Sequence, residues 1–279
     1  MTIELFHTVS QECSKIVTTR YSTSFSSSIR LLHTDLRRPI FNIYGFVRFA
    51  DEIVDTFHEH DKPGLLEEFK KETLDAISRG ISLNPILNSF QQTVNRYGIG
   101  HDLIHAFFSS MESDLSQNRY DRQGYEEYIY GSAEVVGLMC LYVFCEGDKK
   151  QYESLRQPAR ALGAAFQKVN FLRDIKADFN DLSRIYFPGC DFHHFTERDK
   201  LQIEEDIDRD FRNAYEGILE LPMKARFGVY VAYKYYYSLF KKIKSTHPQH
   251  ILQRRIRIPN YHKAYIVLRA SVKNRLRLI

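Results

Sequence analysis

Two pairs of aspartates carry the clearest potential for chemistry in this chain. Asp51 and Asp55 form the first pair, and Asp174 and Asp178 form the second. Because four residues make about one helical turn, each pair predicts two carboxylates on the same face of a helix. Like charges at this spacing destabilise a helix slightly, whereas Mg²⁺ is held by a few carboxylates together with phosphate oxygens. The two pairs therefore predict a metal-assisted site for a diphosphate.

The residues before the first pair extend it into a polar stripe. Arg48 lies one turn before Asp51, and Tyr44 lies a further turn back. All of these side chains can line one wall of a helix. The alternative is an ordinary surface salt bridge between Arg48 and Asp51, which contributes ~0.3 kcal/mol.

A second polar seam runs along the helix that carries the second pair. Gln167, Asn170, Asp174 and Asp178 follow one another at intervals of three and four, with Arg173 beside them. Dry burial would leave such groups unpaired at a cost of ~1–3 kcal/mol each. The seam therefore predicts a hydrated or metal-filled cavity, and the alternative is a face exposed to bulk solvent.

Apolar residues recur every three or four positions through most of the chain, and alternating strand patterns are missing. This period predicts helices, and Pro, Gly and Asn between them predict where helices end. We expect an all-α fold, a single-domain helical bundle over residues 1–279 with a central cavity. The expected helices cover 40–57, 65–77, 103–115, 125–144, 155–179, 204–219 and 225–243.

Composition indicates a globular protein, with 43% hydrophobic and 27% charged residues. The longest apolar run, 135–144, is about half of what a membrane span needs, so we expect no spanning helix. The first residues lack the pattern of a secretory signal, and the four cysteines show no C-x-x-C spacing. These features predict a cytoplasmic protein with reduced thiols.

Charge is distributed unevenly. The segment 221–279 contains 14 Lys and Arg and no Asp or Glu, whereas the first 220 residues contain 25 bases and 35 acids. The basic segment could bind phosphates, rest on an anionic membrane surface as a peripheral contact, or form a solvated face. Nucleic acid is disfavoured because no binding motif accompanies the bases.

Five blocks of the sequence resemble one enzyme family, the squalene and phytoene synthases, which are head-to-head prenyltransferases of isoprenoid biosynthesis. The blocks follow the family order, and the basic region near Arg255 also fits. Two positions differ from many relatives: Glu52 replaces an Asp, and Glu134 replaces a small residue. The matching blocks are 21–26, 44–55, 130–137, 167–178 and 184–188.

The resemblance implies an isoprenoid-synthase fold and assigns roles to particular residues. Two allylic diphosphates would condense through a cyclopropyl diphosphate with the help of Mg²⁺, for which Mn²⁺ is the alternative. The implied metal ligands are Asp51, Asp55, Asn170, Asp174 and Asp178, with Arg48 and Tyr44 as further catalytic residues. The implied substrate-binding residues are Ser22, Ser24, Phe25, Arg48, Tyr130, Gln167, Asn170, Arg173, Tyr236 and Arg255. For Ser22 and Ser24, N-capping of a helix is the alternative role.

Within the family, the chain is most similar to bacterial phytoene synthases. This similarity implies that two geranylgeranyl diphosphates are joined to phytoene, a step of carotenoid biosynthesis, without a nicotinamide. One alternative is squalene or dehydrosqualene formation from farnesyl diphosphate. Another is a non-catalytic relative that binds lipid or serves as an assembly scaffold, although such a relative would be expected to lose the aspartates retained here. Oligomeric state and prenyl chain length are left open.

Overall fold

The computed structural model is mainly helical in the part of the chain that it describes. It describes residues 2–117, 119–180, 185–190, 194–276 and 279, and for 177–180 it describes the helix but not the side chains. Within these residues no strand forms, and a single parallel bridge joins Arg119 to Ile185. The expected all-α fold is confirmed.

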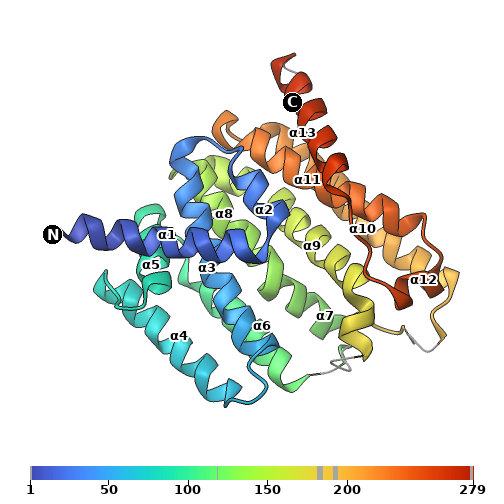
Figure 1. Ribbon diagram of the computed structural model, residues 1–279, viewed down its shortest axis with the longest axis horizontal. Coiled ribbons are helices and arrows are strands. Elements are labelled where there is room, and N and C mark those ends of the chain that lie inside the picture. The colour runs from blue at the N-terminus through green and yellow to red at the C-terminus, as the bar shows by residue number, and fades with distance from the viewer. Residues whose placement is uncertain (1, 118, 181–184, 191–193, 277–278) are drawn as a thin grey trace.

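Six helices make up the N-terminal half (Figure 1). Several begin or end at the residues that the sequence marks as breaks. Gly80 ends α4 with positive φ, and α5 begins at Asn84, which accepts hydrogen bonds from two backbone amides, and ends at Gly98, also with positive φ. The helices are α1 (Ile3–Tyr21), α2 (Thr23–Ile29), α3 (Thr34–Asp55), α4 (Lys62–Arg79), α5 (Pro85–Tyr97) and α6 (His101–Ser116).

The C-terminal half begins with one continuous helix in three parts. Its middle part is a π-helix, in which the backbone amide of Val135 bonds to the carbonyl of Tyr130. Gly131 lies there against the backbone of α6, where a Cβ would meet the carbonyl oxygen of Ala106 at 2.5 Å. The elements are α7 (Arg122–Ile129), η1 (Tyr130–Glu134), α8 (Val135–Cys145), α9 (Lys149–Asn180), α10 (Glu197–Glu220), α11 (Met223–Lys244), α12 (Pro248–Gln253) and α13 (Asn260–Arg275).

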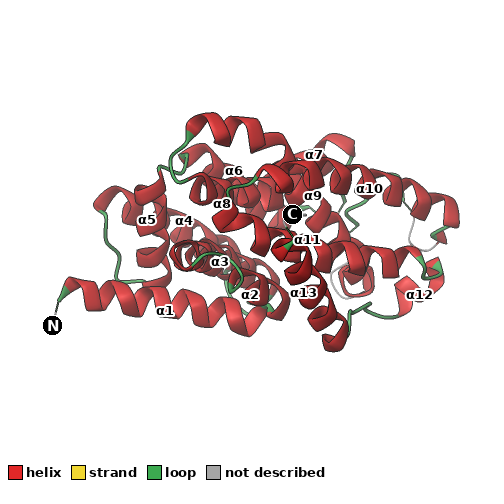
Figure 2. Cartoon of the chain, turned by 90° about the horizontal axis from the view of Figure 1, so that it is seen from above, coloured by secondary structure: helices red, strands yellow, loops and turns green. Residues whose placement is uncertain are grey.

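Helices α3, α8, α9 and α11 surround a central cavity, and α2, α6 and α10 complete its walls (Figures 1 and 2). Close approach of the helices depends on glycine. A Cβ on Gly163 of α9 would lie 2.6 Å from the carbonyl oxygen of Ala133 in η1, and a Cβ on Gly217 of α10 would lie 2.2 Å from Pro158 of α9. The expected bundle with a central cavity is therefore present.

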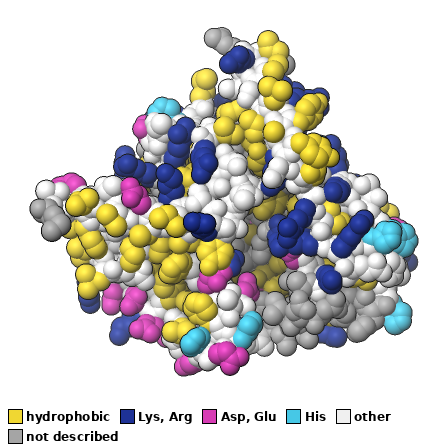
Figure 3. All heavy atoms as spheres, in the orientation of Figure 1, with side chains coloured by type: hydrophobic (Ala, Val, Ile, Leu, Met, Phe, Trp, Pro, Cys, Tyr) yellow, Lys and Arg dark blue, Asp and Glu magenta, His cyan; other side chains and the backbone are white. Residues whose placement is uncertain are grey.

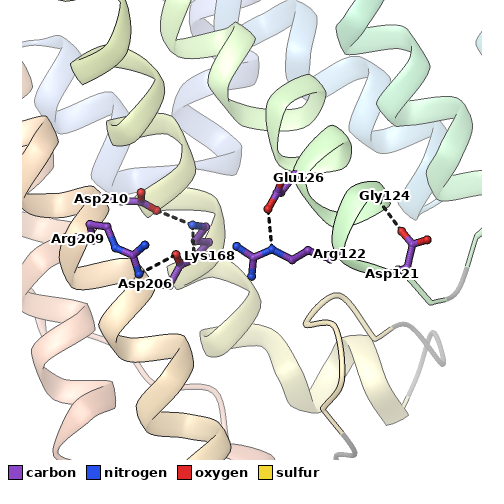
Figure 4. Close-up of polar contacts among 8 residues, drawn as sticks. All are labelled: Asp121, Arg122, Gly124, Glu126, Lys168, Asp206, Arg209 and Asp210. Atoms are coloured by element: carbon purple, nitrogen blue, oxygen red, sulfur yellow. Dashed lines mark hydrogen bonds and ion pairs between the residues drawn. The ribbon is translucent and has the colours of Figure 1, made fainter.

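Helix α9 is also joined to α10 by charge. The ammonium of Lys168 donates to the carboxylates of Asp206 and Asp210, the latter at 2.7 Å (Figure 4). The Lys168 side chain is only 10% exposed. Lys168 is the residue next to Gln167, so these ion pairs fix the rotation of α9 and with it the direction of the polar residues from Gln167 to Asp174.

All seven expected helices are present, and the described residues form five more: α1, α2, α5, α12 and α13. Helix α1 was missed because the side chains it buries are Ser10, Ser14 and Thr18, which break the apolar period. Helix α3 begins at Thr34, six residues before the expected start, because Pro39 is buried inside it without ending it.

The expectation that no helix is long and apolar enough to span a membrane needs correction. The apolar run 135–144 continues back through η1 and α7, and the resulting helix, Arg122–Cys145, passes that test by length and composition. Half of its apolar window is buried inside the protein. Its residues Tyr128, Ser132 and Val136 line the central cavity, as expected of a core helix.

Candidate active site

The central cavity has a volume of about 400 Å³, within the range of small-molecule sites. Charged side chains from α3 and α9 lie in its wall, and small and apolar side chains from α8, α9, α10 and α11 form most of the remainder. Such a cavity can hold an anionic head group and an apolar chain at the same time.

Helix α3 contributes the first aspartate pair and the stripe that precedes it. Tyr44, Arg48, Asp51 and Asp55 all line the cavity, so they share one face as their spacing predicts. Nη1 of Arg48 lies 3.7 Å from Oδ2 of Asp51, and the same guanidinium pairs with Glu52. The salt bridge considered as an alternative is thus present, and it lies within the cavity wall.

Asp51 is held in an unfavourable environment for a charge. Burial, and then repulsion from Asp55, raise the pKa of Asp51 to about 7, although Arg48 acts in the opposite direction. Its side chain is 32% exposed, and it is a lining residue of the cavity. A cation or a hydrogen-bond donor bound in the cavity would relieve this penalty.

Helix α9 brings the second seam to the same cavity. Gln167, Asn170, Arg173 and Asp174 line it, and the side chain of Asp178 lies outside the described residues. The Asp174 carboxylate accepts from Nε of Arg173 at 3.0 Å and pairs with Nε of Arg255 at 2.7 Å. Two guanidinium groups therefore compensate this carboxylate.

Three buried polar atoms in the cavity wall have no hydrogen-bond partner among the described residues. They are Oδ1 of Asn170, Nε of Arg48 and Oγ of Ser132. An unpaired buried polar atom costs about 1–3 kcal/mol, so each is suited to a ligand that is bound during function. The amide oxygen suits a cation, and the guanidinium nitrogen suits a phosphate oxygen.

The oxygen donors fit a hard divalent cation. Asp51, Asp55, Asn170 and Asp174 all present oxygen atoms to one cavity, and Mg²⁺ is usually bound by one or two carboxylates plus substrate phosphates. Among the described side chains, no three His, Cys, Asp or Glu residues come close enough together to form a metal site by themselves. Oxygen donors of this kind suit ions shared between the protein and a phosphorylated ligand.

Four aromatic rings form a cluster in the cavity wall. The rings of Phe25 and Tyr44 lie 4.5 Å apart between centroids, those of Phe166 and Tyr236 stack at 3.9 Å, and Phe25 contacts Tyr236 at 5.8 Å. Burial raises the pKa of Tyr44 well above its usual value, and Tyr236 and Asp51 add to the effect. The phenol of Tyr44 therefore stays neutral beside the carboxylates.

Most of the site residues predicted from the sequence meet at this cavity. Arg255 reaches it only through its ion pair with Asp174, and Ser22, Ser24 and Tyr130 are not among the lining residues. Ser22 caps α2 by accepting from the amide of Phe25 at 3.3 Å, which is the alternative role. The lining residues are Phe25, Tyr44, Arg48, Asp51, Asp55, Gln167, Asn170, Arg173, Asp174 and Tyr236.

Glu134, one of the two departures from the family pattern, is also not among the lining residues. It pairs instead with Nε of Arg160 at 2.6 Å, and the Arg160 guanidinium lies over the ring of Tyr130. The substrate-binding roles of Ser22, Ser24 and Tyr130 stay predictions.

Sequence reasoning missed Asp114 and Phe166 as cavity residues. Asp114 is 7% exposed and accepts from the hydroxyls of Tyr128 at 2.6 Å and Tyr120 at 3.3 Å. The available signal was an acid within the apolar period of the expected helix 103–115. Phe166, adjacent to Gln167 in sequence, carried no signal that separates it from an ordinary core residue.

Comparisons with known proteins agree with this geometry. The family model described as squalene/phytoene synthase matches residues 18–262. A phytoene synthase of Arthrospira platensis is 26% identical, over 96% of this chain and 94% of that protein. A 4,4'-diapophytoene synthase of Staphylococcus haemolyticus (strain JCSC1435) is also 26% identical, and the alignment covers 68% of this chain and 65% of that protein. A solved dehydrosqualene synthase with bound ligand shares the fold with a TM-score of 0.81 and 17% identity, over 96% of this chain and 98% of its own.

Proposed function

We propose that this chain, which belongs to the squalene and phytoene synthase family, condenses two geranylgeranyl diphosphates to phytoene. The prenyltransferases of this family join two prenyl diphosphates head to head. The observation that carries this proposal is the single cavity in which Asp51, Asp55 and Asp174 from two helices meet apolar walls. A prenyl diphosphate needs both, since its head is anionic and its chain is a hydrocarbon.

The charged groups would bind and balance the diphosphates. A divalent cation, Mg²⁺ in our proposal, would be held by Asp51, Asp55, Asn170 and Asp174 and would supply neutralisation of the leaving diphosphate. Arg48, with a buried Nε that lacks a partner among the described residues, would donate to a diphosphate oxygen as charge develops on it.

The apolar and aromatic walls would protect the carbocation that remains. The faces of Phe25, Tyr44 and Tyr236 can stabilise a nearby cation by ~0.5–2 kcal/mol each. The raised pKa of Tyr44 keeps its hydroxyl neutral, so it presents no phenolate that would capture the cation. Exclusion of water matters equally, since water would convert the cation to an alcohol.

The C20 substrate is supported by the cyanobacterial relative, which is named a phytoene synthase and aligns over nearly the whole of both chains. The alternative, a C15 substrate, is favoured by the staphylococcal 4,4'-diapophytoene synthase, which is equally identical over a shorter alignment. The choice depends on how far the apolar part of the cavity extends around Phe144, Leu155 and Leu221.

The test is product formation by purified protein with Mg²⁺ and no nicotinamide. Geranylgeranyl diphosphate should give a C40 hydrocarbon and metal-dependent release of diphosphate, and both should disappear with a chelator. A hydrocarbon formed only from farnesyl diphosphate would replace our proposal by the C15 alternative. Absence of product and of diphosphate release with both substrates would refute the synthase assignment and favour a non-catalytic relative.

A further inference from the structure

Little side-chain bulk separates η1 and α8 from α9 where these helices form the cavity wall. A Cβ on Gly163 would lie 2.6 Å from the carbonyl oxygen of Ala133, and a Cβ on Gly137 would lie 2.9 Å from that of Ala159. All four residues line the cavity. Since none of them carries more than a methyl group, the helices meet here through their backbones. We call this part of the wall, made by Ala133, Gly137, Ala159 and Gly163, the η1–α9 contact.

A π turn lies within the η1–α9 contact. The turn closes with the hydrogen bond from the backbone amide of Val135 to the carbonyl of Tyr130. Such turns are rare and occur mostly as single turns inside α-helices, often at functional sites. A less favourable backbone conformation persists where its surroundings hold it. The side chains that join this turn to α9 therefore control the shape of the cavity wall.

One guanidinium group joins both ends of the π turn to α9. Nε of Arg160 donates to the carboxylate of Glu134 at 2.6 Å, and Cζ of Arg160 lies 5.2 Å from the centroid of the Tyr130 ring. Tyr130 and Glu134 are the first and last residues of η1. Charge-assisted hydrogen bonds and cation–π contacts are both favourable for a guanidinium group. Arg160 therefore holds the two ends of the turn against α9 at once.

This ion pair lies directly behind the cavity wall. Glu134 follows Ala133 in the sequence and Arg160 follows Ala159, but neither charged residue lines the cavity itself. Charged side chains cover much of the outer surface, as the dark blue and magenta spheres of Figure 3 show. The side chains of Glu134 and Arg160 are only 15% and 33% exposed. The pair is therefore a layer between the thin η1–α9 contact and the solvent.

We propose that Glu134, Arg160 and Tyr130 are positioning residues that keep the η1–α9 contact closed and so exclude water from the cavity. The inference rests on the proposed function, because a carbocation formed in the cavity is the species that water would destroy. Glu134 is also one of the two positions at which the chain differs from many relatives, so this role is particular to the present chain.

An open η1–α9 contact would change the product. When the carbon–oxygen bond of a prenyl diphosphate breaks, the bonding electrons leave with the diphosphate and an allylic cation remains. In a closed cavity the second prenyl chain attacks this cation. Where water enters, the water oxygen bonds to the cationic carbon and one of its protons passes to solvent. The product is then a prenyl alcohol, and diphosphate has been released without formation of a hydrocarbon.

The test is the ratio of diphosphate released to hydrocarbon formed by the purified full chain. Condensation of two prenyl diphosphates releases two diphosphates per hydrocarbon, so the wild type should give a ratio close to two. Glu134→Ala and Arg160→Ala should each raise the ratio to ~4 or more, with prenyl alcohol accounting for the excess. A loss of folded protein alone would lower both amounts together and leave the ratio unchanged.

Two further variants separate closure of the wall from other effects. Glu134→Gln keeps the shape of the side chain and an oxygen acceptor for Arg160, so its ratio should lie closer to that of the wild type than to that of Glu134→Ala. The matched control is Arg122→Ala, which removes an exposed ion pair with Glu126 in α7 (Figure 4). Its ratio should equal that of the wild type, because Arg122 does not contact α9 through this pair.

Amide hydrogen exchange tests the η1–α9 contact without turnover. In the ligand-free protein, peptides that cover residues 130–137 should exchange about tenfold faster in Glu134→Ala than in the wild type, because the π turn opens more often. The same peptides should be unchanged in Arg122→Ala. Both measurements use the full chain, and circular dichroism checks that each variant keeps its helices.

The outcomes distinguish the present inference from the proposed function. A ratio near two in both alanine variants would overturn the inference, whether or not exchange is faster, because the wall would still exclude water. A wild type that forms no hydrocarbon and releases no diphosphate would refute the proposed function. In that case the exchange rates still decide the role of these residues, and unchanged exchange in Glu134→Ala would show that they do not hold the η1–α9 contact closed.

Discussion

Replacing Asp51 by Asn should abolish turnover and, at the same time, make the ligand-free protein more stable above neutral pH. The pKa of this carboxyl group rises from 3.8 to about 7 on folding, first through burial and then through repulsion from Asp55. At about 1.4 kcal/mol per pKa unit, the ionised carboxylate costs the folded state up to about 4 kcal/mol. The side chain is 32% exposed to the cavity and Arg48 would lose a partner, so we expect a gain of ~1–3 kcal/mol.

The sign of the pH dependence follows from the protons bound. Between pH 3.8 and about 7 the folded state holds a proton on Asp51 that the unfolded state has lost, so this group lowers stability as pH rises through that window. The advantage of Asp51→Asn over the wild type should therefore be close to zero near pH 4, grow up to about pH 7 and stay constant above it. Thermal or urea unfolding at a series of pH values, with a chelator present, measures this difference.

Asp174→Asn is the matched control, because it is also an acid of the cavity wall and should also abolish turnover. Its carboxylate is compensated by Arg173 and Arg255, so its removal should destabilise the ligand-free protein, by about 1 kcal/mol or more. If Asp51→Asn is no more stable than the wild type at pH 8, or if the difference does not change between pH 5 and 8, the reasoning about repulsion in the cavity is wrong. Near-normal turnover in either variant would contradict its role as a metal ligand.

Three further predictions follow from the packing around the cavity. Lys168→Met leaves two carboxylates of α10, 24% and 18% exposed, without their cation and should lower the free energy of unfolding by about 2 kcal/mol in urea titrations. Arg122→Ala, which breaks an exposed ion pair (Figure 4), should change it by less than about 1 kcal/mol, and equal effects would contradict a stabilising role for the Lys168 contacts. Gly163→Ala should destabilise by about 1–3 kcal/mol in the same assay, because the new methyl group would meet the backbone of η1, and an unchanged midpoint would show that the two helices can separate freely. Tyr44→Leu should lower kcat by about 3- to 30-fold through loss of an aromatic face, whereas Tyr44→Phe should stay near the wild type; an equal loss in both variants would assign the role to the hydroxyl instead.

The sequence was sufficient to predict features that depend on one helix at a time. The four-residue spacing of Asp51 and Asp55 and the seam from Gln167 to Asp174 required only helical geometry, and the structure brings both to one cavity. Helices with a regular apolar period were predicted for the same reason. The family resemblance then supplied the chemistry that spacing alone left open.

Features that depend on contacts between distant segments could not be predicted in this way. The pairing of Arg255 with Asp174 joins residues from α9 and the α12–α13 connection, and no local pattern relates them. Phe166 packs in the cavity wall against Phe25 of α2 and Tyr236 of α11, both of which lie far from it in the sequence. Helix α1 was missed because it buries hydroxyls in place of apolar side chains. Asn88 and Ser89 of α5 form hydrogen bonds with Ser10 and Ser14, and Thr18 donates to carbonyls of α1 and α3.

The π-helix at Tyr130–Glu134 sets the rotational phase of everything that follows it in α8. Its closing hydrogen bond spans five residues instead of four, so this wide turn takes up one more residue than an α-helical turn does. Deleting one residue within it would therefore restore an α-helical turn and leave Val136, Gly137 and Cys140 close to their present directions in the cavity wall. The same deletion in the ordinary turns of α7 would instead set α7 and α8 about 100° out of phase with each other and reshape the cavity in which the carbon chains lie.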